Sequence, residues 1–183
     1  MTASTTAVVV RGLARGLDRL YVLCGVLAAV CLVTLTALIL TSIVSRLLGI
    51  YLGSLTEVAG YAMAAGSFFG MPYAFRAGAH IRVSLLISNL KGRTRWLFEI
   101  WARAVIAAAA GYMAYFFCRL TWFSWDFGEV SEGADAIPLW IPQAVMSAGA
   151  VCFAIATLDS LVRALVEGEA SLSAPEADGA RKE

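Results

Sequence analysis

The feature that most constrains this chain is a run of 26 residues, Leu20 to Ser45, that contains no charged side chain. An α-helix rises about 1.5 Å per residue, so about 20 apolar residues cross the roughly 30 Å hydrocarbon core of a bilayer. A secretory signal peptide has an apolar stretch of only about 7–15 residues, which is much shorter than this run. The run therefore predicts an uncleaved transmembrane helix.

Three further stretches are apolar enough to cross a membrane, and the overall composition agrees. Sixty per cent of the 183 residues are hydrophobic and 15% are charged, with a mean hydropathy of +0.78, which leaves more apolar surface than a water-soluble core can bury. The third stretch is the least regular, but Trp101 and Trp122 lie about 31 Å apart along a helix and match the two membrane interfaces. We therefore predict an all-α integral membrane protein with four transmembrane helices, over residues 20–45, 55–75, 96–123 and 136–158.

Lysine and arginine residues are distributed unevenly between the two sides of the predicted spans. Arg46 and Arg119 fall on one side. The other twelve fall on the opposite side: Arg11, Arg15, Arg19, Arg76, Arg82, Lys91, Arg93, Arg95, Arg103, Arg163, Arg181 and Lys182. Because positively charged segments stay in the cytoplasm, both termini are predicted to be cytoplasmic (N-in, C-in). The acidic connection between the third and fourth spans is then predicted to face outward.

The segments outside the spans carry weaker patterns. Within the N-terminal segment, residues 1–19, the first seven residues are expected to be disordered. Residues 8–20 have one basic and one leucine-rich face, so they either lie on the inner leaflet or extend the first span. From His80 to Leu90, apolar residues at i, i+3, i+4 and i+7 predict a short interfacial amphipathic helix. The tail, residues 166–183, is expected to be disordered.

The chain is poor in groups that carry chemistry. No Asp, Glu, Lys, Arg or His lies within residues 20–45, 58–75 or 136–158 of the first, second and fourth spans, and Glu57 lies at the outer edge of the second span. Ion-coupled carriers, by contrast, usually need a buried acid. A haem would need axial ligands facing each other across helices, and the one histidine, His80, falls in a connection. The four cysteines have no C-x-x-C spacing, and there is no nucleophile elbow or phosphate loop. We expect no enzyme activity, no cofactor and no bound metal. The net charge of +1 gives no reason to expect nucleic acid as a partner.

Packing surfaces are abundant, by contrast. The second span carries a ladder of small residues, Ala62, Gly66 and Gly70, that lets another helix approach closely. Similar ladders occur on the third and fourth spans: Ala107 and Gly111, and Ala144, Ala148, Cys152 and Ala156. These surfaces serve either packing within the four-helix domain or contact with another membrane protein, and the sequence leaves both open.

Three stretches resemble a known family. They are Glu57-Val58-Ala59-Gly60-Tyr61 followed by Gly70, Arg76-Ala77-Gly78-Ala79-His80-Ile81-Arg82-Val83, and Ile137-Pro138-Leu139-Trp140-Ile141-Pro142. With the four-span, N-in layout they are similar, over roughly residues 15–165, to the small membrane subunit (DctQ type) of tripartite ATP-independent periplasmic (TRAP) transporters. The chain departs from the family pattern at Ala79 and Ser84, where the family often has acidic or polar residues.

The resemblance implies a non-catalytic scaffold subunit of a secondary transporter in the bacterial inner membrane. Such a transporter uses a sodium gradient to import an organic acid. The implied partners, besides membrane lipids, are a large multi-span permease subunit that carries the substrate and a periplasmic substrate-binding protein that delivers it. The small subunit would brace the large one and help to dock the binding protein. From the residues alone, two alternatives stay open: an autonomous small carrier, and a membrane anchor for an enzyme complex.

The residues expected to contact a partner subunit or the lipid interface come from the matched motifs and from the ladder on the second span. They are Glu57, Ala62, Gly66, Gly70, His80, Arg82 and Trp140. Three of them, Glu57, His80 and Arg82, match motif positions and are expected to make polar contacts with a partner or with lipid headgroups. The alternative is that they are ordinary interfacial residues. For Glu57 this would be a carboxylate at a helix N-terminus.

Overall fold

The computed structural model describes residues 2–50, 52–53, 55–77, 93–133 and 135–167, and this part of the chain is helical apart from its connections. Its helices are α1 (Thr2–Leu47), α2 (Leu55–Arg76), α4 (Arg93–Asp126) and α5 (Trp140–Glu167). The predicted all-α class is confirmed.

Three stretches of these helices are long and apolar enough to cross a membrane. They are Gly16–Leu47 of α1, Trp96–Asp126 of α4 and Trp140–Leu165 of α5. The remaining predicted span, α2, is not one of them, because the glycines, serine, proline and tyrosines among its 22 residues lower its hydropathy.

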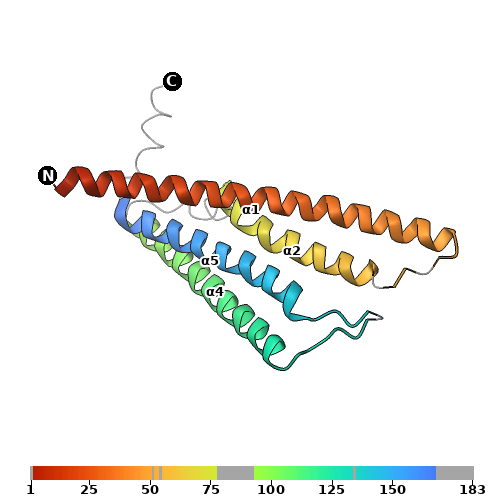
Figure 1. Ribbon diagram of the computed structural model, residues 1–183. Coiled ribbons are helices and arrows are strands. Elements are labelled where there is room, and N and C mark those ends of the chain that lie inside the picture. Colours follow the sequence, from red (N-terminus) through yellow and green to blue (C-terminus); the bar gives the residue numbers. More distant parts are fainter. Residues whose placement is uncertain (1, 51, 54, 78–92, 134, 168–183) are drawn as a thin grey trace, which may run out of the picture.

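The four helices lie side by side and alternate in direction (Figure 1). α1 packs along α2, α2 against α5, and α5 along α4, so α1 and α4 occupy the two outer positions. The end of α1, the start of α2, the end of α4 and the start of α5 lie at the same end of the bundle, which we name the loop end (Figure 1). The opposite end, which we name the terminal end, carries the contacts of Asp18 with Arg76 and of Arg103 with Ser160.

The side of α1 that packs on its neighbours follows a spacing of three and four residues. Its buried and half-buried positions include the line Tyr21, Cys24, Ala28, Cys31, Leu35, Leu38, Ser42 and Ser45. A helix with such a spacing keeps one line of residues against its partner over many turns. The helix is continuous from Thr2, so residues 8–20 extend the first span, and residues 2–7 are helical where disorder was expected (Figure 1).

The core between α4 and α5 is built from alanine. Ala110 and Ala114 of α4 and Ala150 and Ala154 of α5 are all buried, with Phe68, Met113 and Phe153 packed against them. The Phe68 ring of α2 also meets the Phe117 ring of α4 edge-on, with their centroids 4.8 Å apart. Small residues bring the helix backbones close, and the phenylalanines fill the space at the edges of the contact.

The ladders predicted on α4 and α5 are only partly right. On α4, Ala107 is buried, but a Cβ placed on Gly111 would meet nothing within 4 Å. On α5, Ala156 is buried and Ala148 is exposed. The buried line of α5 is instead Ser147, Ala150, Ala154 and Thr157.

The fourth predicted span begins later than expected, at Trp140 rather than residue 136. Ala136 has a φ of 44°, which is outside the helical region, and Val130 pairs with Pro138 in an antiparallel bridge. These residues therefore belong to a folded loop before α5. The interfacial helix predicted from His80 to Leu90 and the tail from residue 168 onward lie outside the described residues.

Candidate functional site

Polar groups gather at the loop end, where the start of α2 meets the loop between α4 and α5. The Tyr61 hydroxyl donates a hydrogen bond to Glu57 Oε1 at 2.6 Å, one helical turn away. The other carboxylate oxygen of Glu57 lies directly against the backbone of Gly133, so that a side chain on Gly133 would overlap it. Glu57 of α2 thus lies against the loop, and glycine at position 133 permits the close approach.

The loop is held in shape by its own hydrogen bonds. The Ser131 amide donates to the Ile137 carbonyl at 2.8 Å, and the Ile137 amide donates to Ser131 Oγ at 3.1 Å. At its base, the buried Ser124 hydroxyl of α4 donates to Glu129 Oε2 at 2.6 Å. The loop is therefore a defined structure, and it positions its acidic residues beside α2.

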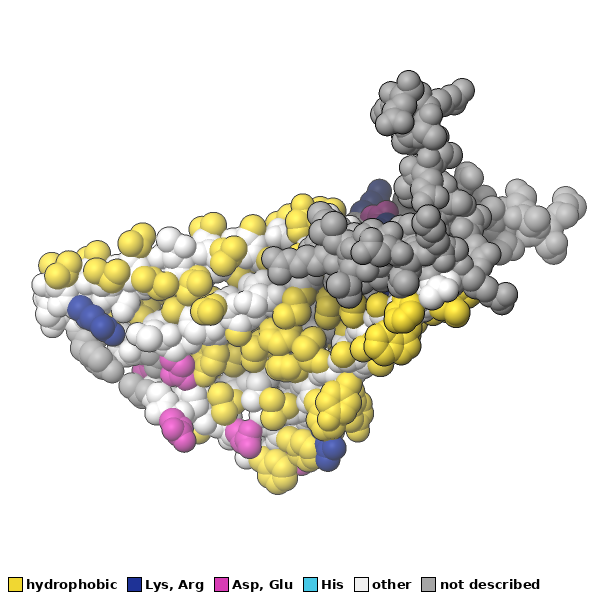
Figure 2. All heavy atoms as spheres, turned by 180° about the vertical axis from the view of Figure 1, so that it is seen from behind, with side chains coloured by type: hydrophobic (Ala, Val, Ile, Leu, Met, Phe, Trp, Pro, Cys, Tyr) yellow, Lys and Arg dark blue, Asp and Glu magenta, His cyan; other side chains and the backbone are white. Residues whose placement is uncertain are grey.

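The start of α2 and the loop form an open cleft of about 860 Å³. Glu57 and Tyr61 line it from α2, and Glu129, Ser131 and Glu132 line it from the loop. Three carboxylates in one cleft make its electrostatic potential negative. Within the residues that the structure describes, no group of three or more His, Cys, Asp or Glu side chains is placed to hold a metal ion. Figure 2 shows hydrophobic side chains along the visible face of the helices, with acidic ones gathered towards the loop end.

The ladder predicted on α2 faces α1. A Cβ on Gly66 would lie 3.2 Å from the Cys31 Cβ, and one on Gly70 would lie 3.9 Å from the Ala28 Cβ. Ala62, one turn before Gly66, is half-buried. Gly66 is thus the closest approach of the ladder, and its contact lies within the chain.

Two further glycines allow close approach, and the sequence analysis missed both. A Cβ on Gly149 of α5 would lie 2.8 Å from the Phe68 Cβ and 2.9 Å from the Phe68 carbonyl carbon. A Cβ on Gly25 of α1 would lie 2.8 Å from the ring of Tyr73. The available signal was glycine in a helix interior, which costs about 0.5–1 kcal/mol relative to alanine and needs a reason to persist.

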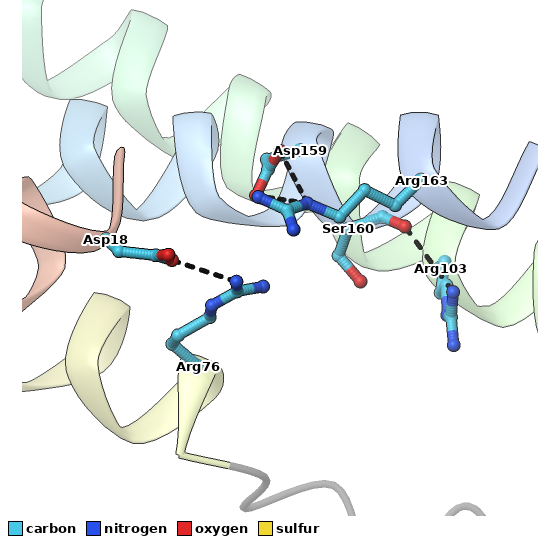
Figure 3. Close-up of polar contacts among 6 residues, drawn as sticks. All are labelled: Asp18, Arg76, Arg103, Asp159, Ser160 and Arg163. Carbon is cyan, nitrogen blue, oxygen red and sulfur yellow. Dashed lines mark hydrogen bonds and ion pairs between the residues drawn. The ribbon is translucent and has the colours of Figure 1, made fainter. Parts of the chain in front are cut away.

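Ion pairs and a backbone contact join the helices at the terminal end (Figure 3). The Arg76 guanidinium of α2 lies 2.8 Å from the Asp18 carboxylate of α1. On the other side, the Arg103 guanidinium of α4 pairs with Glu99 and reaches the Ser160 carbonyl of α5 at 3.4 Å. Arg163 pairs with Asp159 at 3.0 Å within α5. The Asp18–Arg76 pair connects α1 to α2, and the contact of Arg103 with Ser160 connects α4 to α5.

We expect Asp18→Asn to have only a small effect on stability. The two side chains of the Asp18–Arg76 pair are 50% and 39% exposed, and an exposed ion pair contributes about 0.2–1 kcal/mol. The midpoint of thermal unfolding in detergent should fall by less than about 4 °C. A larger fall would mean that this pair controls the packing of α1 on α2.

Of the remaining predicted site residues, one lies in the described part of the chain and two lie outside it. Trp140 is the first residue of α5, and its ring meets that of Trp125 edge-on, with the centroids 4.8 Å apart. This contact connects the end of α4 to the start of α5 at the loop end. His80 and Arg82 lie outside the described residues.

A comparison with known protein families identifies a family that the chain matches. Residues 35–167 match the family described as tripartite ATP-independent periplasmic transporters, DctQ component. No curated protein and no solved structure matches the chain. The matched residues make up more than half of the chain and run from the last third of α1 to the end of α5. The chain therefore belongs to the DctQ component family of the tripartite ATP-independent periplasmic transporters.

Proposed function

We propose that this chain is the non-catalytic scaffold subunit of a TRAP transporter that imports an organic acid on a sodium gradient. In this role it braces a large permease subunit in the bacterial inner membrane, and the large subunit carries the substrate. The observation that carries the proposal is family membership, together with helix centres that contain no charged residue.

The distribution of charge supports a bracing role over a transport role. α1 has no charged residue between Arg19 and Arg46, and α2 has none between Glu57 and Arg76. The central turns of α4 and α5 are likewise free of Asp, Glu, Lys, Arg and His. An ionisable residue in the membrane usually marks a path for ions or substrate. Helices without one are suited to support a path that another subunit supplies.

The proposal includes four membrane crossings with both termini in the cytoplasm. The 22 residues of α2 give a length of about 33 Å, which is enough to cross a bilayer beside α1. In the sequence, twelve of the fourteen Lys and Arg residues precede residue 20, fall between residues 76 and 103, or follow residue 158. The positive-inside rule would then direct the terminal end to the cytoplasm and the acidic loop to the periplasm.

The periplasmic loop would help to dock the substrate-binding protein. Glu57, Glu129 and Glu132 share the cleft at the loop end and give it a negative potential. Such a surface favours a partner with basic side chains, and the attraction would weaken as salt is added.

Reconstitution tests the proposal. In liposomes, the purified chain alone should accumulate none of a panel of radiolabelled dicarboxylates and sugar acids down a sodium gradient. The chain together with the large permease subunit and the binding protein should accumulate one of them, and omission of the small subunit should abolish uptake. Uptake by the small subunit alone would show that it is a carrier, and undiminished uptake without it would show that it braces nothing.

A further inference from the structure

The two outer helices, α1 and α4, each turn a broad face away from the rest of the bundle. The outward face of α1 is aliphatic and consists of Val22, Leu23, Val26, Val30, Val33, Leu40, Ile43 and Val44, all exposed. The hydroxyls of Thr36 and Thr41 are bonded within the helix, to the carbonyls of Leu32 and Ala37. Such a surface suits contact with lipid chains, because it is mostly aliphatic and the hydroxyls of Thr36 and Thr41 are bonded within the helix.

The outward face of α4 differs in chemistry. Seven exposed residues follow one another at spacings of four and three: Trp101, Val105, Ala108, Tyr112, Tyr115, Arg119 and Trp122. We name this line the α4 outer face. It lies on the side of the helix opposite to Ala107, Ala110 and Ala114, which are buried.

Tyr112 and Tyr115 of the α4 outer face lie between the two membrane interfaces, whereas Arg119 is only three residues from Trp122 and lies near one of them. Tyr112 is 11 residues from Trp101 and 10 from Trp122, so it lies about 15–17 Å from either, near the middle of a bilayer. Its side chain is 67% exposed, and that of Tyr115 is 61% exposed. Neither hydroxyl has a hydrogen-bond partner in the described part of the chain. Lipid chains at this depth offer no acceptor.

Arg119 adds a positive charge to the same face. Its guanidinium lies over the ring of Phe123, 5.2 Å from the centroid, and no carboxylate among the described residues pairs with it. Phe116 contacts the rings of both Tyr112 and Tyr115, with centroid distances of 4.4 and 5.3 Å. Trp, Tyr and Arg are the residue types that contribute most to protein–protein binding, and here they form one continuous surface.

We propose that the α4 outer face binds a transmembrane helix of the large permease subunit. The partner helix presents hydrogen-bond acceptors to Tyr112 and Tyr115 and a carboxylate to Arg119, while the outward face of α1 faces lipid. The inference rests on the proposed function, because it takes the large subunit as the partner. It goes beyond that function by assigning the interface to α4 rather than to α1.

The test compares tryptophan at two exposed alanines, Ala108→Trp on α4 and Ala29→Trp on α1. Each full-length variant is co-expressed with a tagged large permease subunit, and the small subunit that co-purifies in mild detergent is measured. We expect Ala108→Trp to lower this yield about tenfold or more, because the indole separates the two surfaces, and Ala29→Trp to change it less than about twofold. Tyr112→Phe combined with Tyr115→Phe removes only the two hydroxyls and should lower the yield about fivefold.

The outcomes separate the two proposals. If the wild-type chain does not co-purify with the large subunit, both the proposed function and the proposed interface are wrong. If the wild-type chain does co-purify, and Ala29→Trp lowers the yield as much as Ala108→Trp, only the assignment of the interface to α4 is wrong. Size-exclusion chromatography of each variant alone shows whether it folds. Should Ala108→Trp not fold, an unchanged yield for the double tyrosine variant would overturn the inference.

Discussion

Gly149→Leu is expected to separate α5 from α2 and to cause a large loss of stability. The first atom of the new side chain would lie 2.8 Å from the Phe68 Cβ and 2.9 Å from its carbonyl carbon. A backbone atom of a helix cannot move aside as the end of a side chain can, so the two helices must move apart. We expect a cost of about 3 kcal/mol, or a midpoint of thermal unfolding in detergent lowered by about 6–12 °C.

Gly60→Leu is the matched control, because it places the same side chain on a helix position with nothing within 4 Å of its Cβ. It should leave the midpoint unchanged or raise it slightly, since glycine is a poor helix former. Equal midpoints for the Gly149 and Gly60 variants would show that α2 and α5 do not touch at Gly149 in the purified protein.

The effect of Gly149 extends to the alanine core. Phe68, which Gly149 contacts, packs on Ala110, Ala114, Ala150 and Ala154 and meets the ring of Phe117. Displacement of Phe68 would therefore loosen the contact of α4 with α5 as well. A single glycine on α5 thus controls the packing of three helices.

The helices themselves could be predicted from the sequence, because each apolar run is long and is bounded by charged residues. The buried face of α5 could not. Small residues occur on several sides of this helix, so the pattern Ala144, Ala148, Cys152 and Ala156 looked as good as the line Ser147, Ala150, Ala154 and Thr157 that is buried. Which line is used depends on the position of Phe68, and that residue belongs to another helix.

In the candidate site, too, contacts within one helix could be predicted from the sequence, and contacts between distant segments could not. Glu57 is expected from the sequence to make polar contacts with a partner or with lipid headgroups, which stays a prediction. Its contact with Tyr61 within the chain follows the i, i+4 geometry of a helix. The approach of Gly133 could not be predicted, because it depends on how the loop between α4 and α5 folds back over α2. The start of α5 was placed too early for a related reason, since the apolar residues 136–139 belong to that loop.

Gly66→Leu is expected to impair assembly with the large permease subunit much more than Glu57→Gln. A Cβ on Gly66 would lie 3.2 Å from the Cys31 Cβ and 3.7 Å from the Ala28 carbonyl oxygen, so the larger leucine would push α1 away from α2. Overpacking of this kind costs about 1–3 kcal/mol. The Glu57→Gln variant, by contrast, would keep an oxygen that accepts the Tyr61 hydrogen bond, and it would remove one of three negative charges from the cleft.

The two variants and the wild type are compared by expression level and by the yield of small subunit that co-purifies with the tagged large subunit. We expect Gly66→Leu to lower the yield at least about tenfold, which corresponds to a loss of about 1.4 kcal/mol or more in the free energy of assembly. We expect Glu57→Gln to lower it less than about twofold, which corresponds to a much smaller loss. Cys31→Gly opens space opposite Gly66, so adding it to Gly66→Leu should restore part of the yield if the clash is the cause. Equal yields for Gly66→Leu and Glu57→Gln would contradict this order. They would mean that close packing of α1 on α2 matters no more to assembly than the charge at the start of α2.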